Sequence, residues 1–135
     1  MIREAVYKLL TADATLAGLV GTRIYPEAIP ARTQRPAIVI DTLTLRRIQG
    51  TRAATAWRTA RFEVGIVADS VVACNTVAQA VLAVLGRYQG TVPGLSGITI
   101  DDIVDTDSSS ERVPRLGDGG VYALPLEFEA FWKET

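Results

Sequence analysis

Residues 57–68, with the sequence WRTARFEVGIVA, decide the fold of this chain. From residue 60 to residue 66, every second side chain is apolar: Ala60, Phe62, Val64 and Ile66. The polar residues Thr59, Arg61 and Glu63 stand between them. Because successive side chains of a strand point to opposite faces, this period of two predicts a strand with a buried face and an outward face.

A second strand is predicted just upstream, over residues 37–46. A β-branched run, Ile38 to Ile40, opens the segment, and the alternating residues 42–45 continue it. Residues 46–55, RRIQGTRAAT, join the two strands and are too long and too polar for a tight turn. We therefore expect a long β-hairpin whose tip protrudes and is mobile.

Two further strands are predicted downstream, over residues 98–104 and 121–133. The last strand alternates clearly, and its apolar face consists of Tyr122, Leu124, Leu126, Phe128, Ala130 and Trp132. Pro125 lacks an amide hydrogen, so this strand either lies at a sheet edge or has its outward amide position unpaired there. The polar connector 106–120 is expected to be flexible without a partner.

A long middle helix is predicted over residues 71–87, with Asp69 and Ser70 as its N-cap. Its core stripe consists of Val71, Cys74, Ala78, Val81, Leu82 and Leu85. Its opposite face is small or apolar as well: Ala73, Thr76, Ala80, Ala83 and Val84. Residues 70–86 contain no charge, whereas the solvent face of a surface helix usually does. We expect one side to be covered by the chain's own sheet and the other by a neighbouring copy.

The N-terminal region is predicted to be helical over residues 2–11 and again, briefly, over residues 13–19. Pro26, Pro30 and Pro36 exclude a regular element over residues 26–36. The resulting order of helix, two strands, helix and two strands predicts one α+β domain spanning residues 1–135. The expected architecture is a four-stranded antiparallel sheet with a long β-hairpin, and with the N-terminal and middle helices packed on one face.

Composition excludes several function classes. The chain has 135 residues, no histidine and one cysteine, Cys74. It therefore offers no histidine for a catalytic triad or a zinc site, and Cys74 is expected to be a small core residue. No apolar run approaches the length of a membrane span, and the N-terminus does not resemble a signal peptide, so we expect a cytosolic protein with no membrane partner. Apolar residues make up 48%, which hints that a partner covers some surface.

The net charge of −1 conceals an asymmetry. Residues 1–68 contain ten basic and five acidic residues, whereas residues 69–135 contain four basic and ten acidic ones. Twelve of the fourteen basic residues are arginine, which pairs in a fork with carboxylates. A molecule with two halves of opposite sign can dock head to tail with copies of itself.

Two clusters of residues could indicate a binding site, one for a metal ion and one for a phosphate group. The strand acids Asp101, Asp102, Asp105 and Asp107 could hold Mg²⁺, but alternation places Asp101 and Asp105 on one face and Asp102 on the other. The cluster is therefore interpreted as a solvated or interface surface. Residues 117–120, GDGG, precede a strand rather than a helix and are interpreted as a turn, not a phosphate cradle. The sequence predicts no enzyme activity, metal or cofactor.

The arginine-rich hairpin has two interpretations. It carries Trp57 and five arginines: Arg46, Arg47, Arg52, Arg58 and Arg61. These side chains could pair with the acidic half of a neighbouring copy. Alternatively, the hairpin is a nucleic-acid-binding module, although no recognition-helix pattern accompanies it. The candidate subunit interface thus comprises the uncharged helix face, these arginines and the four strand acids.

Several landmarks resemble the tail-completion, or tail-terminator, proteins of long-tailed bacteriophages and related particles. They are residues 9–13 (LLTAD), Leu16, residues 19–26 (LVGTRIYP) and residues 35–40 (RPAIVI). The resemblance extends through the hairpin, the middle helix and the final LEFEAFWKE strand. The uncharged middle helix is a departure, because this helix often carries charges in the family.

The resemblance implies a structural, non-enzymatic role in the virion, with assembly in the host cytoplasm. It implies a homo-oligomeric ring, usually a hexamer, at the head-proximal end of the tail tube. Such a ring contacts the tail tube protein and the neck or head-completion protein, ends tube growth and joins head to tail. DNA is expected to pass through the ring's channel without specific binding.

Overall fold

The computed structural model describes residues 2–47, 57–106 and 113–134. Three helices are present in these ranges: α1 (Ile2–Thr11), α2 (Ala14–Val20) and α3 (Val71–Leu85). The strands are β1 (Ile24–Tyr25), β2 (Ala37–Arg47), β3 (Trp57–Ala68), β4 (Gly90–Val92), β5 (Leu95–Asp105), β6 (Arg115–Leu116) and β7 (Tyr122–Glu134). The three described helices fall short of the length and apolar character needed to cross a membrane.

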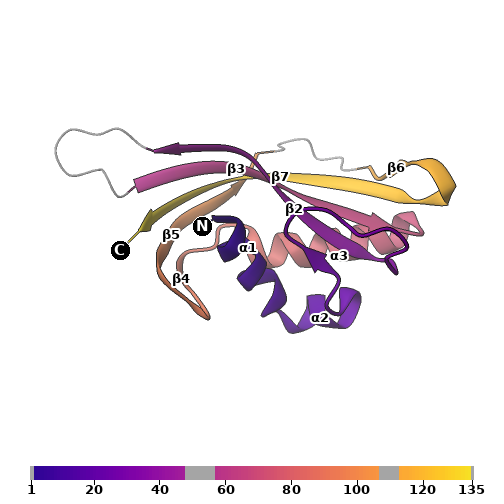
Figure 1. Ribbon diagram of the computed structural model, residues 1–135, viewed down its shortest axis with the longest axis horizontal. Coiled ribbons are helices and arrows are strands. Elements are labelled where there is room, and N and C mark those ends of the chain that lie inside the picture. Colours follow the sequence, from indigo (N-terminus) through magenta and orange to yellow (C-terminus); the bar gives the residue numbers. More distant parts are fainter. Residues whose placement is uncertain (1, 48–56, 107–112, 135) are drawn as a thin grey trace.

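Within the described residues the strands form one seven-stranded sheet, in the order β1-β2-β3-β7-β5-β4, with β6 also paired to β7 (Figure 1). The α+β class is confirmed, but the expected four-stranded, fully antiparallel sheet is wrong. The four predicted strands are β2, β3, β5 and β7, and β1 adds a parallel pair to β2. The additional strands β1, β4 and β6 have only two or three residues each, which is too short to show a period in the sequence.

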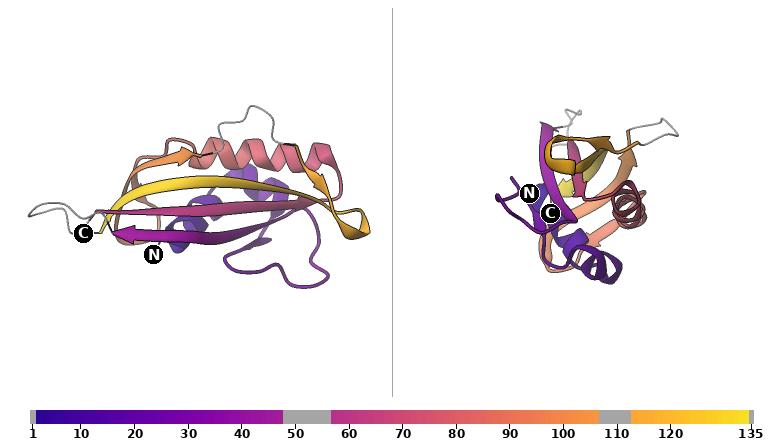
Figure 2. Two further views of the ribbon diagram at one scale, coloured as in Figure 1. Left: turned by 90° about the horizontal axis from the view of Figure 1, so that it is seen from above. Right: turned by 90° about the vertical axis from the view of Figure 1, so that its right-hand side faces the viewer.

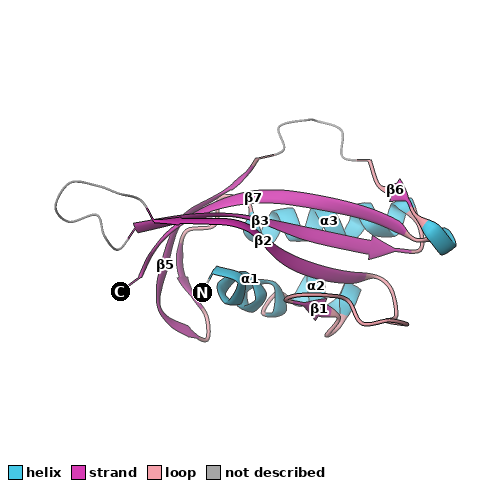
Figure 3. Ribbon diagram, turned by 45° about the horizontal axis from the view of Figure 1, so that its top comes forward, coloured by secondary structure: helices cyan, strands magenta, loops and turns pink. Residues whose placement is uncertain are grey.

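The core lies between the sheet and the helices, which cover one face of it (Figures 2 and 3). Phe62 of β3 is in register with Phe128 of β7, and their rings stack with centroids 5.4 Å apart. Both side chains are fully buried, as is Trp132. The sheet curls so that β4 and β5 also contact α1. The predicted inward positions of β3 and β7 are thus confirmed, apart from Tyr122, which is half-buried.

Strand β7 is not a sheet edge, because β3 flanks it on one side and both β5 and β6 flank it on the other. Pro125 nevertheless lies at a gap: β6 pairs with β7 only at residues 122–123, and β5 pairs with it only from Phe128 onward. The Glu127 carbonyl accepts the Thr106 amide on this side, and alternation directs the Pro125 nitrogen the same way. Of the two predictions for Pro125, the sheet edge is therefore wrong, and the strand instead has an unpaired amide position there.

Local contacts fix the helix ends. The Ser70 hydroxyl accepts the Ala73 amide at 3.1 Å, so Ser70 is the N-cap of α3, as predicted. Asp13 caps α2 in the same way through the Leu16 amide, at 2.9 Å. The neighbouring Asp69 carboxylate accepts the Arg35 Nε–H at 2.6 Å, which ties the proline-rich loop to the start of α3. The chain has no helix or strand over residues 26–36, as predicted.

Candidate functional site

The chain itself covers the predicted second face of α3 only in part. The buried stripe that faces the sheet consists of Cys74, Val77, Ala78, Val81 and Leu85. The opposite residues Thr76 and Ala83 are exposed, and Ala73, Ala80 and Val84 are half-buried. Two predicted core positions differ: Val71 is exposed, and Leu82 is half-buried. Coverage by a neighbouring copy stays a prediction.

Further apolar side chains are exposed near the start of α3. Val72 is 74% exposed, and Leu116 of β6 is 63% exposed. The two elements lie at one end of the molecule, because Leu116 is in register with Tyr122, whose carbonyl accepts the Cys74 S–H at 3.5 Å. Sequence analysis missed this apolar end. The only signal for it was the high apolar content, since Leu116 lies in a connector with no periodicity.

The arginines of the predicted basic patch lie on different faces of the sheet. Arg61 points outward and forms an ion pair with Glu127 at 2.6 Å. Arg58 is half-buried and in register with the fully buried Trp132, so it lies on the inner, core-facing side. Arg46 and Arg47 stand in register with Thr59 and Arg58, and Arg52 lies outside the described residues, as does the predicted mobile tip from residue 48 onward.

The strand acids are separated by a β-bulge. The register of β5 against β7 shifts between Ile100 and Asp102, which leaves Asp101 as the extra residue. Asp102 then pairs with Phe131 and Asp105 with the buried Phe128, so these two acids face opposite sides. Asp102 also forms an ion pair with Arg87 at 3.1 Å. Asp107 lies outside the described residues, within which no group of three or more acids or cysteines could hold a metal.

Three other carboxylates do meet, on the outer face of the sheet. Asp41 of β2 is in register with Glu63 of β3, which is in register with Glu127 of β7. We call these three residues the acid row. Burial raises the pKa of the Glu63 carboxyl, and repulsion from Asp41 and Glu127 raises it further. Sequence analysis missed the acid row because only strand register brings residues so distant in the sequence together.

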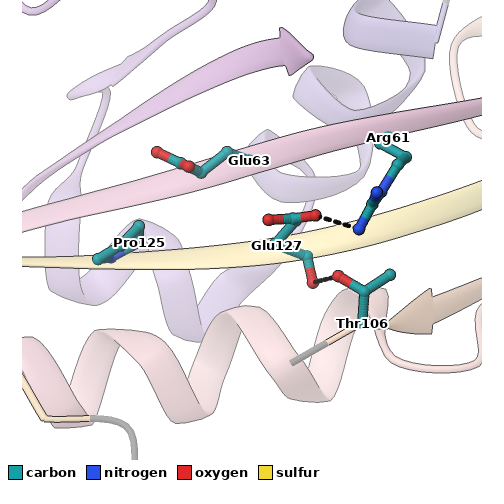
Figure 4. Close-up of a pocket in the computed structure, with 5 residues that line it drawn as sticks. All are labelled: Arg61, Glu63, Thr106, Pro125 and Glu127. Atoms are coloured by element: carbon teal, nitrogen blue, oxygen red, sulfur yellow. Dashed lines mark hydrogen bonds and ion pairs between the residues drawn. The ribbon is translucent and has the colours of Figure 1, made fainter. Parts of the chain in front are cut away.

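The acid row borders a hollow at the gap between β5 and β6, which we call the notch. The notch has a volume of about 320 Å³ and is lined by Arg61, Glu63, Thr106, Pro125 and Glu127 (Figure 4). Arg61 engages one carboxylate oxygen of Glu127, and the Thr106 hydroxyl donates to the Glu127 carbonyl at 3.2 Å. Glu63 lines the notch from the neighbouring strand β3, on the side of Pro125.

Two smaller predictions are confirmed. Residues 118–120 form a short 3₁₀ turn, in which Gly119 and Gly120 adopt φ values of 74° and 76° that favour glycine. Cys74 is a buried residue of α3, and burial raises the pKa of its thiol. Both segments therefore have structural roles.

The comparisons with known proteins agree with this fold. The family model described as "Tail completion protein gp17" matches residues 4–133. A chain of the structure titled "Virion of native gene transfer agent (GTA) particle" superposes with a TM-score of 0.71 at 21% identity, over 98% of this chain and 94% of that one. That likeness shows the fold, and no curated protein matches the sequence. Because the family model spans almost the whole chain, this protein belongs to the gp17 tail completion family and is a structural component of a phage-like virion tail and neck.

Proposed function

We propose that copies of this chain close into a ring at the head-proximal end of a tail tube. The observation that carries the proposal is α3, a 15-residue helix without a single charged residue, on whose outer face Thr76 and Ala83 are exposed while Ala73, Ala80 and Val84 are half-buried. An apolar helix face of this kind is stabilised when a neighbouring subunit excludes water from it. Because the two halves of the chain differ in sign, the contact is heterologous, and such contacts form rings when the rotation closes.

In this position the ring, a hexamer as in the family it resembles, ends tube growth and binds the neck. The tail tube protein contacts one side of the ring and the head-completion protein contacts the other. DNA passes through the channel without specific binding, for which a net charge of −1 is suited. The family is a structural one and not an enzyme class, and the proposed role needs no turnover, metal or cofactor.

The substitution Ala83→Arg tests the α3 contact. Ala83 is exposed in the single chain, so we expect the unfolding free energy to stay within about 0.5 kcal/mol of wild type. An arginine buried without a partner at the subunit contact is expected to prevent assembly. Sedimentation velocity and negative-stain imaging measure the result, with Ala83→Ser as the matched control. Normal rings formed by Ala83→Arg would show that this face is not the interface.

A particle-level experiment tests the role of the ring. Particles produced without this protein are expected to show unjoined heads and tails, or tubes longer than normal. Electron microscopy of lysates measures both, and expression of the chain in trans is the control. If the protein stays monomeric at high concentration and does not bind tube or neck components, the proposed function is wrong.

A further inference from the structure

The outer face of the sheet has a charged part and an uncharged part. Strand register forms rows of residues that stand side by side across β2, β3 and β7 on this face. Within the described residues, the acid row and the rows beyond it toward the hairpin each contain at least one charged residue, for example Arg61 beside Glu129. The two rows on the other side of the acid row contain none. We call these six residues the shelf: Val39, Gly65 and Pro125 in one row, and Ala37, Val67 and Ala123 in the next.

The shelf is low at its centre and accessible to a partner. Ala123 and Pro125 are exposed, and Val39, Gly65 and Val67 are half-buried. A Cβ at Gly65 would lie only 3.0 Å from Val39 Cγ1, so glycine lets the Val39 side chain lean over β3. A glycine inside a strand is typical of a place that another backbone approaches closely. None of the described helices covers this face (Figure 3).

The outermost line of α3, which we call the α3 ridge, has matching properties. It consists of four exposed residues at spacings of four, three and four: Val72, Thr76, Gln79 and Ala83. These spacings place all four on one side of the helix. The Thr76 hydroxyl already donates to the Val72 carbonyl at 2.8 Å, so it needs no acceptor from a partner. The α3 ridge therefore brings no charge into a contact.

The α3 ridge and the shelf also have similar lengths. Val72 and Ala83 are separated by about 16 Å along the helix axis. Tyr25 of β1 is in register with Val39, so the row through Gly65 and Pro125 crosses the adjacent strands β1, β2, β3 and β7. The spacings between these strands add up to about 14 Å. The α3 ridge therefore fits the length of this row.

The α3 ridge of one copy cannot cover the shelf of the same copy. Helix α3 contacts β3 and β7 from the core side, through its buried stripe. The shelf lies on the opposite face of the same strands (Figures 2 and 3). A contact between the α3 ridge and the shelf therefore requires two molecules.

We propose that the α3 ridge of one copy packs on the shelf of the next copy in the ring. This inference rests on the proposed function and names the surface that covers α3. The lack of charge on both surfaces, their similar length and the low centre at Gly65 identify a second copy as the occupant. A helix displaced onto the acid row would bury carboxylates against neutral side chains, so the edge of the shelf also fixes where the α3 ridge lies. Each copy donates one ridge and accepts one, which is a heterologous contact.

Cysteine cross-linking in the full-length chain tests this contact. Ala123→Cys on the shelf is combined either with Ala83→Cys or with Val72→Cys, at the two ends of the α3 ridge, and the native Cys74 is buried. With a short bis-maleimide we expect one of these double variants to form a ladder of linked oligomers on denaturing gels. Which variant does so depends on the direction in which the helix crosses the shelf. The matched controls replace Ala123→Cys by Thr44→Cys, an exposed outer-face position beyond the acid row, and should form no ladder.

The substitution Ala123→Arg provides a second measurement. Ala123 is exposed in the single chain, so we expect the urea midpoint of the monomer to match that of wild type. An unpaired charge at the contact should weaken self-association about tenfold or more in sedimentation velocity.

Three outcomes would overturn the inference. If Ala83→Arg prevents assembly while Ala123→Arg does not and neither double variant forms a ladder, the shelf is wrong and the ring proposal stands. If neither arginine variant affects assembly, the α3 contact of the proposed function is wrong as well. If Ala83→Cys alone is cross-linked into dimers, α3 packs on α3 of another copy instead of on the shelf.

Discussion

The two faces of strands β2, β3 and β7 differ sharply in what they contact. On the inner face, Phe62 stacks on Phe128 in a fully buried core. On the outer face, Glu63, the very next residue, stands between two other carboxylates. The inner face is stabilised by folding alone, because its buried apolar side chains find apolar neighbours within the chain. The outer face retains repulsion after folding, and this difference locates the surface on which a partner can still lower the free energy.

The largest expected effect belongs to the inner face. Phe62→Ala removes half of the stacked pair and leaves a cavity, so we expect a loss of about 3–5 kcal/mol in unfolding free energy. Urea denaturation followed by fluorescence measures it. The matched outer-face variant Thr59→Ala, at a half-buried position of the same strand, should change stability by less than about 1 kcal/mol. Similar losses for the two variants would contradict the distinction between the faces.

A smaller effect of opposite sign is expected from Glu63→Gln. The substitution keeps the shape of the side chain and removes its repulsion from Asp41 and Glu127. We expect the free subunit to gain roughly 0.2–1 kcal/mol at pH 7. Urea denaturation of dilute monomer measures this gain. A loss of stability in the monomer would indicate that Glu63 has a stabilising partner instead.

The smallest expected effect is the pH dependence of that gain. The folded chain holds the Glu63 proton more tightly than the unfolded chain does, because the carboxyl pKa is raised above its ordinary value of 4.5. The advantage of Glu63→Gln should therefore be absent well below pH 4.5 and should grow as pH rises through the raised pKa. The groups beside Glu63 in this comparison are Asp41, Glu127 and Arg61. A difference between the two proteins that does not vary with pH would rule out ionisation as the cause.

Sequence periodicity was sufficient to predict the long helices and strands, but it could not predict the short strands. Strands β2, β3 and β7 and helices α1 and α3 each span ten residues or more, so their apolar periods are visible. Strands β1, β4 and β6 exist because the neighbouring backbone offers them partners, which no local pattern reveals. For the same reason the central position of β7 could not be read from Pro125, whose missing donor falls in a gap between two short pairings.

The candidate site was predictable where it depends on a single element. The uncharged character of α3 is a property of 15 consecutive residues, and in the structure Thr76 and Ala83 of its outer face are exposed. Coverage of this face by a neighbouring copy stays a prediction. The acid row depends on the register between three strands, so it could be found only after the sheet was known. Parity within β3 separates Arg58 from Arg61, because even positions face inward and odd positions face outward. The bulge at Asp101 had no sequence signal.

Pro125 has a consequence for the free subunit before it joins a particle. Between β6 and β5, residues 124–127 of β7 have no strand partner on that side among the described residues, although the Glu127 carbonyl accepts the Thr106 amide. Pro125 has no amide hydrogen, so it interrupts pairing with a strand of another chain and makes aggregation through this stretch less favourable. The subunit is thus protected from indiscriminate β-sheet growth at this unpaired stretch of β7.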